Sequence, residues 1–211
     1  MALSTFVKVS EVTNLSDARY CAGMGVHLLG FSLEVEQPHY VSPEKYAAIT
    51  EWLAGVQFAA EFDSYSVPEI EEVLLHYARI TYLQTSQPWQ IEALQSLNKP
   101  IIVRLDARHY DEDVVALADI MRTCRNRVAY FLIDHSSPTP RPELLNDLLD
   151  LARQYPILLG FGFQASQLPA LVKEQQLAGL ALRGSQEVEP GYHNFDQLAD
   201  ILEAIEIDEA S

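Results

Sequence analysis

Ionisable and hydroxyl side chains stand at the ends of two apolar segments of the chain. Residues 6–10 carry Lys8 and Ser10 two positions apart, and Glu11 follows directly. Residues two apart in a strand share a face, so Lys8 could support a reactive serine or a bound phosphate. The apolar run 130–133 ends at Asp134, which could donate a proton at neutral pH only if its pKa were raised. An Asp at a strand end also commonly accepts backbone hydrogen bonds in the next loop, and this alternative stays open.

Eight short aliphatic segments recur along the chain, and each is followed by a longer segment with helical spacing of its apolar residues. The expected strands are 6–10, 27–32, 56–60, 80–83, 101–104, 129–133, 157–160 and 179–182. The expected helices begin near Asn14, Pro43, Val67, Pro88, Asp111, Arg141, Ser166 and Phe195. Several of these starts carry Pro in the first turn or an Asn, Ser or Asp cap, which is typical of helix N-termini.

Strands that alternate with helices predict a parallel sheet, and eight such units can close into an α/β (β/α)8 barrel, the TIM barrel. The competing fold, an open doubly wound sheet, usually has a glycine-rich turn after its first strand. Residues 10–13 read Ser-Glu-Val-Thr instead. We therefore expect a single barrel domain over residues 1–211, with 207–211 as a frayed acidic tail.

The charge balance limits the class of partner. The chain has 30 acidic and 14 basic residues and a formal charge of -16, which repels nucleic acids and anionic membranes, so neither is expected as a partner. Cys21 and Cys124 lie far apart in expected helices and predict neither a disulfide nor a zinc site, so we expect both to be buried. No apolar run approaches the roughly 20 residues of a membrane helix, and a cytoplasmic protein is expected.

Two segments carry a resemblance to a known family. Residues 7–18 read Val-Lys-Val-Ser-Glu-Val-Thr-Asn-Leu-Ser-Asp-Ala, and residues 38–44 read Pro-His-Tyr-Val-Ser-Pro-Glu. They resemble the phosphoribosylanthranilate isomerases of tryptophan biosynthesis, which open on Val-Lys-Ile-Cys-Gly-Ile-Thr before Asn-x-x-Asp-Ala and later carry Pro-Arg-Tyr-Val-Ser-Pro-Glu. Weaker similarities follow in order at 83–84, 100–102, 132–134, 159–163 and 187–191. The chain is thus identified as a divergent member over nearly its whole length.

The resemblance implies a site at the C-terminal ends of the barrel strands, where barrel enzymes place their chemistry. It also implies an Amadori-type isomerisation of a phosphoribosyl amine, in which an acid protonates the sugar ring oxygen and a base removes the C2 proton. Neither a cofactor nor a metal is required. Asp134 takes the position of the family's acid, and Gln84, within a weaker match, is expected to contact the substrate.

Several positions depart from the family pattern. Ser10 replaces the cysteine base, and because an alcohol is a weak base without an activating partner, Glu11 is a candidate replacement. The alternative is that Ser10 is a small core hydroxyl and Glu11 a solvated loop residue. His39 replaces the arginine implied for the anthranilate carboxylate, and Ala181 replaces an aspartate. Arg183 could bind an anion or form a surface salt bridge.

The glycine-rich elements implied for phosphate binding are also altered. Residues 135–142 contain prolines and lack glycine, which removes backbone N–H donors. Phe161 replaces one glycine after the seventh strand and could fill the barrel mouth, whereas Gly162 and Gly184 still permit close backbone approach. The candidate catalytic residues are Asp134, Ser10 and Glu11. The candidate substrate-binding residues are Lys8, His39, Gln84, Gly162, Arg183, Gly184 and Ser185.

Three functions remain open at this point. The first is a phosphoribosylanthranilate isomerase or a relative that acts on a phosphorylated sugar amine. The second is a paralogue that kept the barrel, lost this catalysis and serves as a binding or interaction protein. The third is a different barrel enzyme that uses Glu11, His39 and His135, since one fold hosts many chemistries. In each case the expected partner is a small molecule, with or without a phosphate, and the sequence indicates no oligomeric state.

Overall fold

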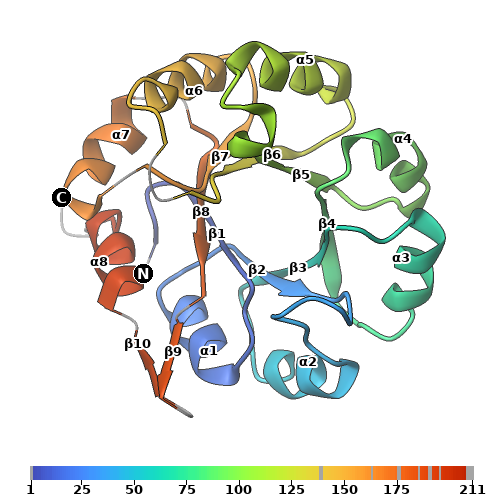
Figure 1. Ribbon diagram of the computed structural model, residues 1–211. Helices are drawn as coiled ribbons and strands as arrows, with labels where there is room; N and C mark the ends of the chain where they lie inside the picture. Colours follow the sequence, from blue (N-terminus) through green and yellow to red (C-terminus); the bar gives the residue numbers. More distant parts are fainter. Residues whose placement is uncertain are drawn as a thin grey trace.

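The eight parallel strands of the chain close into a barrel in the order β1 to β8, and β8 pairs back with β1 (Figure 1). The computed structural model describes residues 2–137, 140–162, 164–174, 177–184, 186–189, 192–194 and 196–207. The fold is the predicted single-domain (β/α)8 barrel. Its strands are β1 (Phe6–Ser10), β2 (Leu28–Ser32), β3 (Gln57–Phe62), β4 (Ile80–Thr85), β5 (Ile101–Asp106), β6 (Tyr130–Asp134), β7 (Ile157–Leu159) and β8 (Gly179–Arg183).

Helices surround the barrel on the outside (Figure 1). They are α1 (Leu15–Gly23), α2 (Pro43–Thr50), α3 (Val67–Leu74), α4 (Ile91–Leu94), α5 (Val114–Cys124), α6 (Leu144–Ala152), α7 (Leu168–Glu174) and α8 (Asp196–Ala204). Short 3-10 turns are η1 (Pro88–Gln90), η2 (Gln95–Leu97), η3 (Ala107–Tyr110) and η4 (Ala165–Gln167). In the described part of the chain no helix has the length and apolar character needed to cross a membrane.

Several element boundaries differ from the predicted ones. Strands β3, β4 and β5 each run two residues beyond the predicted ends, because the main-chain ladder continues where the apolar run stops. Helix α5 begins at Val114 rather than near Asp111, since Asp111 and Glu112 are left-handed with φ of 53° and 54°. The antiparallel hairpin of β9 (Gln186–Glu189) and β10 (Tyr192–Asn194) between β8 and α8 was not predicted.

The two cysteines and the C-terminal segment can be compared with their predictions. Cys21 and Cys124 are free and buried, as expected. The tail was expected to fray from residue 207, but the Ile207 backbone N–H donates to the Ala2 carbonyl at 2.9 Å. The segment therefore stays attached to the barrel through Ile207, and residues 208–211 lie outside the described part of the chain.

The barrel interior changes from apolar to polar along the strands. On the side of the N-terminal strand ends, the interior holds a small apolar cluster of Leu28, Ala59, Ile102, Leu132, Leu158 and Ala181. Aromatic rings pack beneath it, with the centroids of Phe6 and Tyr130 4.9 Å apart. Because strand residues alternate between faces, the next interior positions toward the C-terminal ends follow two residues later. Two of these positions are the glycines Gly30 and Gly160, and the others carry polar side chains: Lys8, Glu61, Gln84, Arg104, Asp134 and Arg183.

Candidate active site

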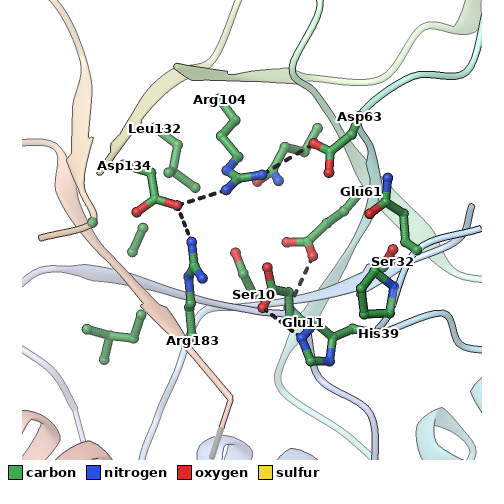
Figure 2. A pocket seen from close by; sticks show the side chains of 16 residues that line it. Ser10, Glu11, Ser32, His39, Glu61, Asp63, Arg104, Leu132, Asp134 and Arg183 are labelled. Carbon is green, nitrogen blue, oxygen red and sulfur yellow. Dashed lines mark hydrogen bonds and ion pairs between the residues drawn. The ribbon is translucent and has the colours of Figure 1, made fainter. Parts of the chain in front are cut away.

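A narrow cavity opens at the C-terminal ends of the strands, where the polar interior layer reaches the surface (Figure 2). Its free volume is about 50 Å³, whereas sites for small organic ligands usually occupy roughly 300 Å³ or more. A phosphorylated sugar amine would therefore enter only if side chains at the rim moved. The polar lining residues are Ser10, Glu11, Ser32, Gln37, His39, Glu61, Asp63, Gln84, Arg104, Asp134 and Arg183.

Lys8 lies beneath this cavity in a buried polar contact. Its side chain is 0% exposed and Nζ donates to Ser10 Oγ and to Glu61 Oε1. The partner carboxylate comes from β3, whereas the β8 residue opposite Lys8 is Ala181. A Cβ at Gly30 would lie 2.0 Å from Glu61 Oε1, so only glycine leaves room for the ion pair. The predicted shared face of Lys8 and Ser10 is confirmed, but Lys8 itself does not line the cavity.

Glu11 lies at the rim of the cavity in a left-handed conformation, with φ of 59°. Its backbone N–H donates to Glu61 Oε2 at 3.1 Å, and this contact holds the turn after β1. A non-glycine residue in this region stores on the order of 1 kcal/mol of strain, which the bond to Glu61 helps to offset. The Glu11 carboxylate faces His39, with 3.6 Å between Oε2 and Nε2. Glu11 thus turns its carboxylate toward the rim rather than away into solvent.

Asp134 binds two guanidinium groups across the cavity mouth (Figure 2). Its Oδ2 accepts from Arg104 at 3.0 Å and from Arg183 at 2.6 Å, and its Oδ1 accepts from the His135 backbone N–H at 2.8 Å. Burial opposes ionisation of the carboxyl, but the charge and hydrogen bond of Arg183, together with Arg104, outweigh it and lower the pKa of Asp134. In this arrangement Asp134 is an ionised carboxylate, contrary to the raised pKa that an acid requires.

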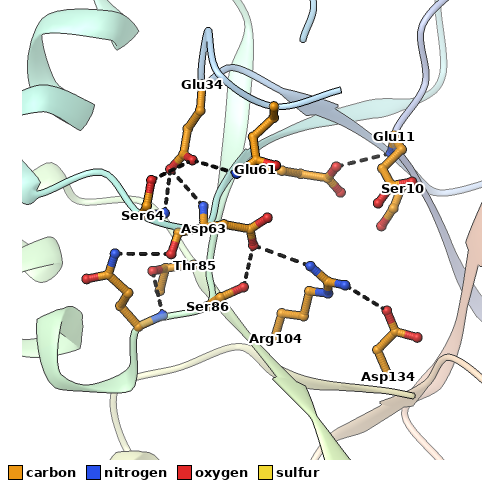
Figure 3. A network of polar contacts seen from close by, with 12 residues as sticks. Ser10, Glu11, Glu34, Glu61, Asp63, Ser64, Thr85, Ser86, Arg104 and Asp134 are labelled. Carbon is orange, nitrogen blue, oxygen red and sulfur yellow. Dashed lines mark hydrogen bonds and ion pairs between the residues drawn. The ribbon is translucent and has the colours of Figure 1, made fainter. Parts of the chain in front are cut away.

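The network continues from Arg104 to the loop after β3 (Figure 3). Asp63 Oδ1 accepts from Arg104 at 3.3 Å and from Ser86 Oγ. Glu34, which is 0% exposed, accepts at Oε1 from the backbone N–H groups of Asp63 and of the next two residues at 2.7 to 2.8 Å. The buried carboxylate of Glu34 therefore fixes the loop that carries Asp63, and Asp63 in turn orients Arg104.

The buried side-chain oxygen of Gln84 indicates a site for a ligand that donates a hydrogen bond. Its side chain lines the cavity, is 4% exposed, and its Oε1 has no hydrogen-bond partner among the described residues. Leaving a buried acceptor unsatisfied costs about 1–3 kcal/mol. A ligand N–H or O–H group at this position would recover that energy.

Several expected site residues lie elsewhere. Gly162 and Gly184 do not line the cavity, and the Gly184 backbone N–H donates to the Ser10 carbonyl at 2.9 Å. Phe161 does not fill the mouth but packs on His135, with ring centroids 5.2 Å apart. Ser185 lies outside the described residues. The polar lining of the cavity therefore comes from β1 to β6 and β8, together with the loops after β1, β2 and β3, and neither Gly162 nor Gly184 belongs to it.

Sequence reasoning missed Glu61, Asp63 and Arg104. A signal for Glu61 was available, because a lysine on the inward face of an apolar strand is almost never buried without a partner. The signal for Arg104 was a basic residue inside an otherwise apolar strand segment, 101–105. Among the described residues no three His, Cys, Asp or Glu side chains are placed to hold a metal ion together.

Comparison with known proteins bears on the fold and on the resemblance. No protein-family model matches the chain. The N-(5'-phosphoribosyl)anthranilate isomerase of Pelodictyon phaeoclathratiforme is 22% identical over 215 residues, which cover 95% of this chain and 97% of that protein. The similarity read from individual segments thus extends over nearly the whole chain.

Solved structures agree with this similarity. The phosphoribosyl anthranilate isomerase of Thermus thermophilus has a TM-score of 0.73 at 23% identity, covering 95% of this chain and 98% of that chain. A second such isomerase, in complex with reduced 1-(o-carboxyphenylamino)-1-deoxyribulose 5-phosphate, has a TM-score of 0.69 at 18% identity with the same coverage. The chain therefore has the barrel fold of these isomerases from end to end.

Proposed function

We propose that this chain is a divergent phosphoribosylanthranilate isomerase that acts on a phosphoribosyl amine at the barrel mouth. The observation that carries the proposal is the placement of Asp134 on β6 opposite Ser10 and Glu11 at the end of β1, with the open cavity between them (Figure 2). Acid and base must act on different atoms of one sugar, so they must lie on different sides of it. The isomerisation oxidises one carbon and reduces its neighbour, so it needs no external electron acceptor.

Glu11 is the base in this proposal. Ser10 Oγ accepts a hydrogen bond from Lys8 Nζ, and Lys8 is also paired with the Glu61 carboxylate. An ammonium group held by a carboxylate keeps its proton and cannot take one from Ser10, so the serine is not activated as a base. The Glu11 carboxylate is partly exposed at the rim, where His39 Nε2 lies 3.6 Å from its Oε2 and the charge of Arg183 also acts on it. Ser10 then serves to hold Lys8 in place beneath the substrate.

Asp134 becomes an acid only when Arg183 leaves it. Arg183 is the more exposed of its two partners, with a side chain 53% exposed against 22% for Arg104. A substrate phosphate offers Arg183 a doubly charged partner, and its movement would also widen the cavity. Losing one guanidinium raises the pKa of Asp134 toward a value at which it holds a proton. Substrate binding and acid activation are coupled in this way.

The test is turnover of phosphoribosylanthranilate by the purified protein, followed by the loss of substrate fluorescence. We expect Asp134→Asn and Glu11→Gln each to lower kcat/KM at least about 100-fold, which is the usual contribution of a general acid or base. Ser10→Ala should lower it less than about tenfold. The matched control is Glu36→Gln, at an exposed residue near the rim, which should leave kcat/KM unchanged.

Two results would count against the proposal. One is the absence of turnover by the wild-type protein together with no growth of a tryptophan auxotroph that lacks the isomerase. The other is unchanged turnover in Asp134→Asn. If Ser10→Ala and not Glu11→Gln abolished turnover, the base would be Ser10 and the reaction class would stand.

The second candidate is a barrel that binds such a ligand without converting it. The lowered pKa of Asp134 favours this function, because a carboxylate held by two guanidiniums has no proton to give. A rise in Tm with the reduced product analogue, without any turnover of phosphoribosylanthranilate, would support it. In either case we propose that the protein acts in the cytoplasm, as one barrel domain over residues 1–211.

A further inference from the structure

A second and larger cavity adjoins the candidate active site. Its free volume is about 470 Å³, within the usual range for small-molecule sites of roughly 300–1,000 Å³. It lies over the C-terminal ends of β3, β4 and β5, and it shares Asp63 and Arg104 with the narrow cavity. The candidate catalytic residues Ser10, Glu11 and Asp134 do not line this second cavity. Its aromatic and ionisable lining residues are Asp63, Trp89, Arg104, Asp106, His109 and Tyr110.

Aromatic side chains form part of the wall. Trp89, in η1 after β4, is 76% exposed although it lines the cavity. Tyr110, at the end of η3 after β5, is half-buried beside the same space. A large ring held at the edge of a cavity with its surface open to water offers a stacking surface for a planar ligand.

Two carboxylates, those of Asp63 and Asp106, also line the cavity. Asp106 is 8% exposed, and its Oδ1 accepts from the backbone N–H groups of Arg108 at 3.0 Å and Ser136 at 3.2 Å. Both of these backbone hydrogen bonds reach Oδ1, which leaves Oδ2 outside them. Asp63 lies in the wall shared with the active site. The one guanidinium of the cavity, on Arg104, is bound to Asp63 and Asp134, so the excess charge of the cavity is negative.

We infer that this cavity binds a planar aromatic cation, with the ring on Trp89 and the cationic group at Asp106 and Asp63. An open indole face and an incompletely paired, mostly buried carboxylate are the two features that favour such a ligand over a neutral or anionic one. The formal charge of -16 on the whole chain concentrates cations at its surface in the same direction. This inference goes beyond the isomerisation and does not depend on it.

The experiment compares benzamidine, benzamide and benzoate, three planar rings of similar size with charges of one positive, zero and one negative. The chain has two tryptophans, so the variant Trp52→Phe leaves Trp89 as the only indole fluorophore. Binding is followed at a single pH of 8 for all three compounds. We expect benzamidine to change the Trp89 emission with a Kd at least tenfold lower than that of benzamide, and benzoate to give no saturable change.

A second variant tests the carboxylate. Asp106→Asn keeps an oxygen that can accept from Arg108 and Ser136 but removes the charge, so it should weaken benzamidine at least tenfold and leave benzamide unchanged. Asp150→Asn, at an exposed aspartate on α6, is the matched control and should change neither Kd. Urea unfolding midpoints identify any variant that is not folded, and isothermal titration of Trp89→Ala in the otherwise wild-type chain should show at least tenfold weaker benzamidine binding.

The inference is overturned if benzamide or benzoate binds as tightly as benzamidine, if saturating benzamidine leaves Trp89 emission unchanged, or if folded Asp106→Asn binds benzamidine normally. These readouts need no turnover. Failure here therefore leaves the proposed isomerisation untouched, and failure of the isomerisation leaves this binding site intact.

Discussion

The chemistry of the barrel mouth depends on which partner each carboxylate has. Asp134 is held by two arginines, while Glu11 has one ion-pair partner among the described residues, His39. Both groups are carboxylates at strand ends, yet their surroundings favour opposite roles. In the proposed reaction, Asp134 must lose a guanidinium before it can hold a proton, and Glu11 takes the role of the base.

The first prediction concerns Arg183→Ala. The folded pKa of Asp134 lies below its unfolded value of about 3.9, so its ion pairs stabilise the fold above that pH and cease to do so as the pH falls through the folded pKa. Because Arg183 is half-exposed, the variant should lose only about 1 kcal/mol or less of unfolding free energy at pH 7. Urea unfolding at pH 7 and near pH 2 measures the change, which should disappear in acid. An equal loss at both pH values would contradict the assignment.

The second prediction concerns the buried pair beneath the site. Lys8→Met leaves Glu61 charged without a cation, so it should cost about 3–5 kcal/mol of unfolding free energy. The double variant Lys8→Met with Glu61→Gln removes the stranded charge and keeps an acceptor for the Glu11 backbone N–H. It should recover at least half of that loss in urea unfolding. A double variant no more stable than Lys8→Met would show that Lys8 matters for its packing and not for its charge.

At the scale of elements, loops after β2 and β3 build the wall of the site together. Glu34 comes from the loop after β2, and its carboxylate gathers the backbone N–H groups at the start of the loop after β3. That loop supplies Asp63 to Arg104, which binds Asp134 on β6. Glu34, which does not itself line the cavity, is thus linked to Asp134 through Asp63 and Arg104.

The third prediction follows from this arrangement. Glu34→Gln replaces a charged acceptor of several N–H groups by one neutral oxygen, so the amides of Asp63, Ser64 and Tyr65 should exchange with solvent at least about tenfold faster. Hydrogen exchange followed by mass spectrometry measures the change. Glu36→Gln is the control, because its carboxylate contacts the exposed Tyr65 hydroxyl and no backbone N–H of the loop. Equal exchange in the two variants would rule out the role assigned to Glu34.

At the scale of the whole molecule, the excess of negative charge opposes folding. A formal charge of -16 on 211 residues produces self-repulsion that a compact state feels more than an extended one. The site itself is mixed in sign, with Arg104 and Arg183 set against Asp63, Asp134, Glu11 and Glu61. A phosphorylated ligand must therefore approach against the field of the protein and depends on the local arginines.

The fourth prediction concerns salt. Raising NaCl from about 0.01 M to 0.2 M shortens the screening length from roughly 30 Å to below 10 Å, so the Tm at pH 7.5 should rise by about a few degrees. Near the isoelectric point of about 4.6 the same addition should have a much smaller effect, since little net charge remains to be screened. Differential scanning calorimetry measures both. A Tm that falls with salt at pH 7.5 would mean that local ion pairs, and not overall repulsion, dominate.

The sequence by itself determined the barrel, the positions of its strands to within about two residues and the shared face of Lys8 and Ser10. These features follow from alternation and helical spacing, which are local properties of the chain. Asp134, Glu11, Gln84 and Arg183 were also singled out, and all four line the cavity.

Only the tertiary structure decided what these residues contact. Closure of the barrel brings Glu61 to Lys8 across 53 positions and Arg183 to Asp134 across 49, and no local pattern encodes such pairs. The ionised state of Asp134 and the room left for a ligand follow from those contacts. Because electrostatic energy depends on distance and burial rather than on residue type alone, only the folded chain shows that the carboxylate expected to act as the acid is bound by two arginines, which lower its pKa.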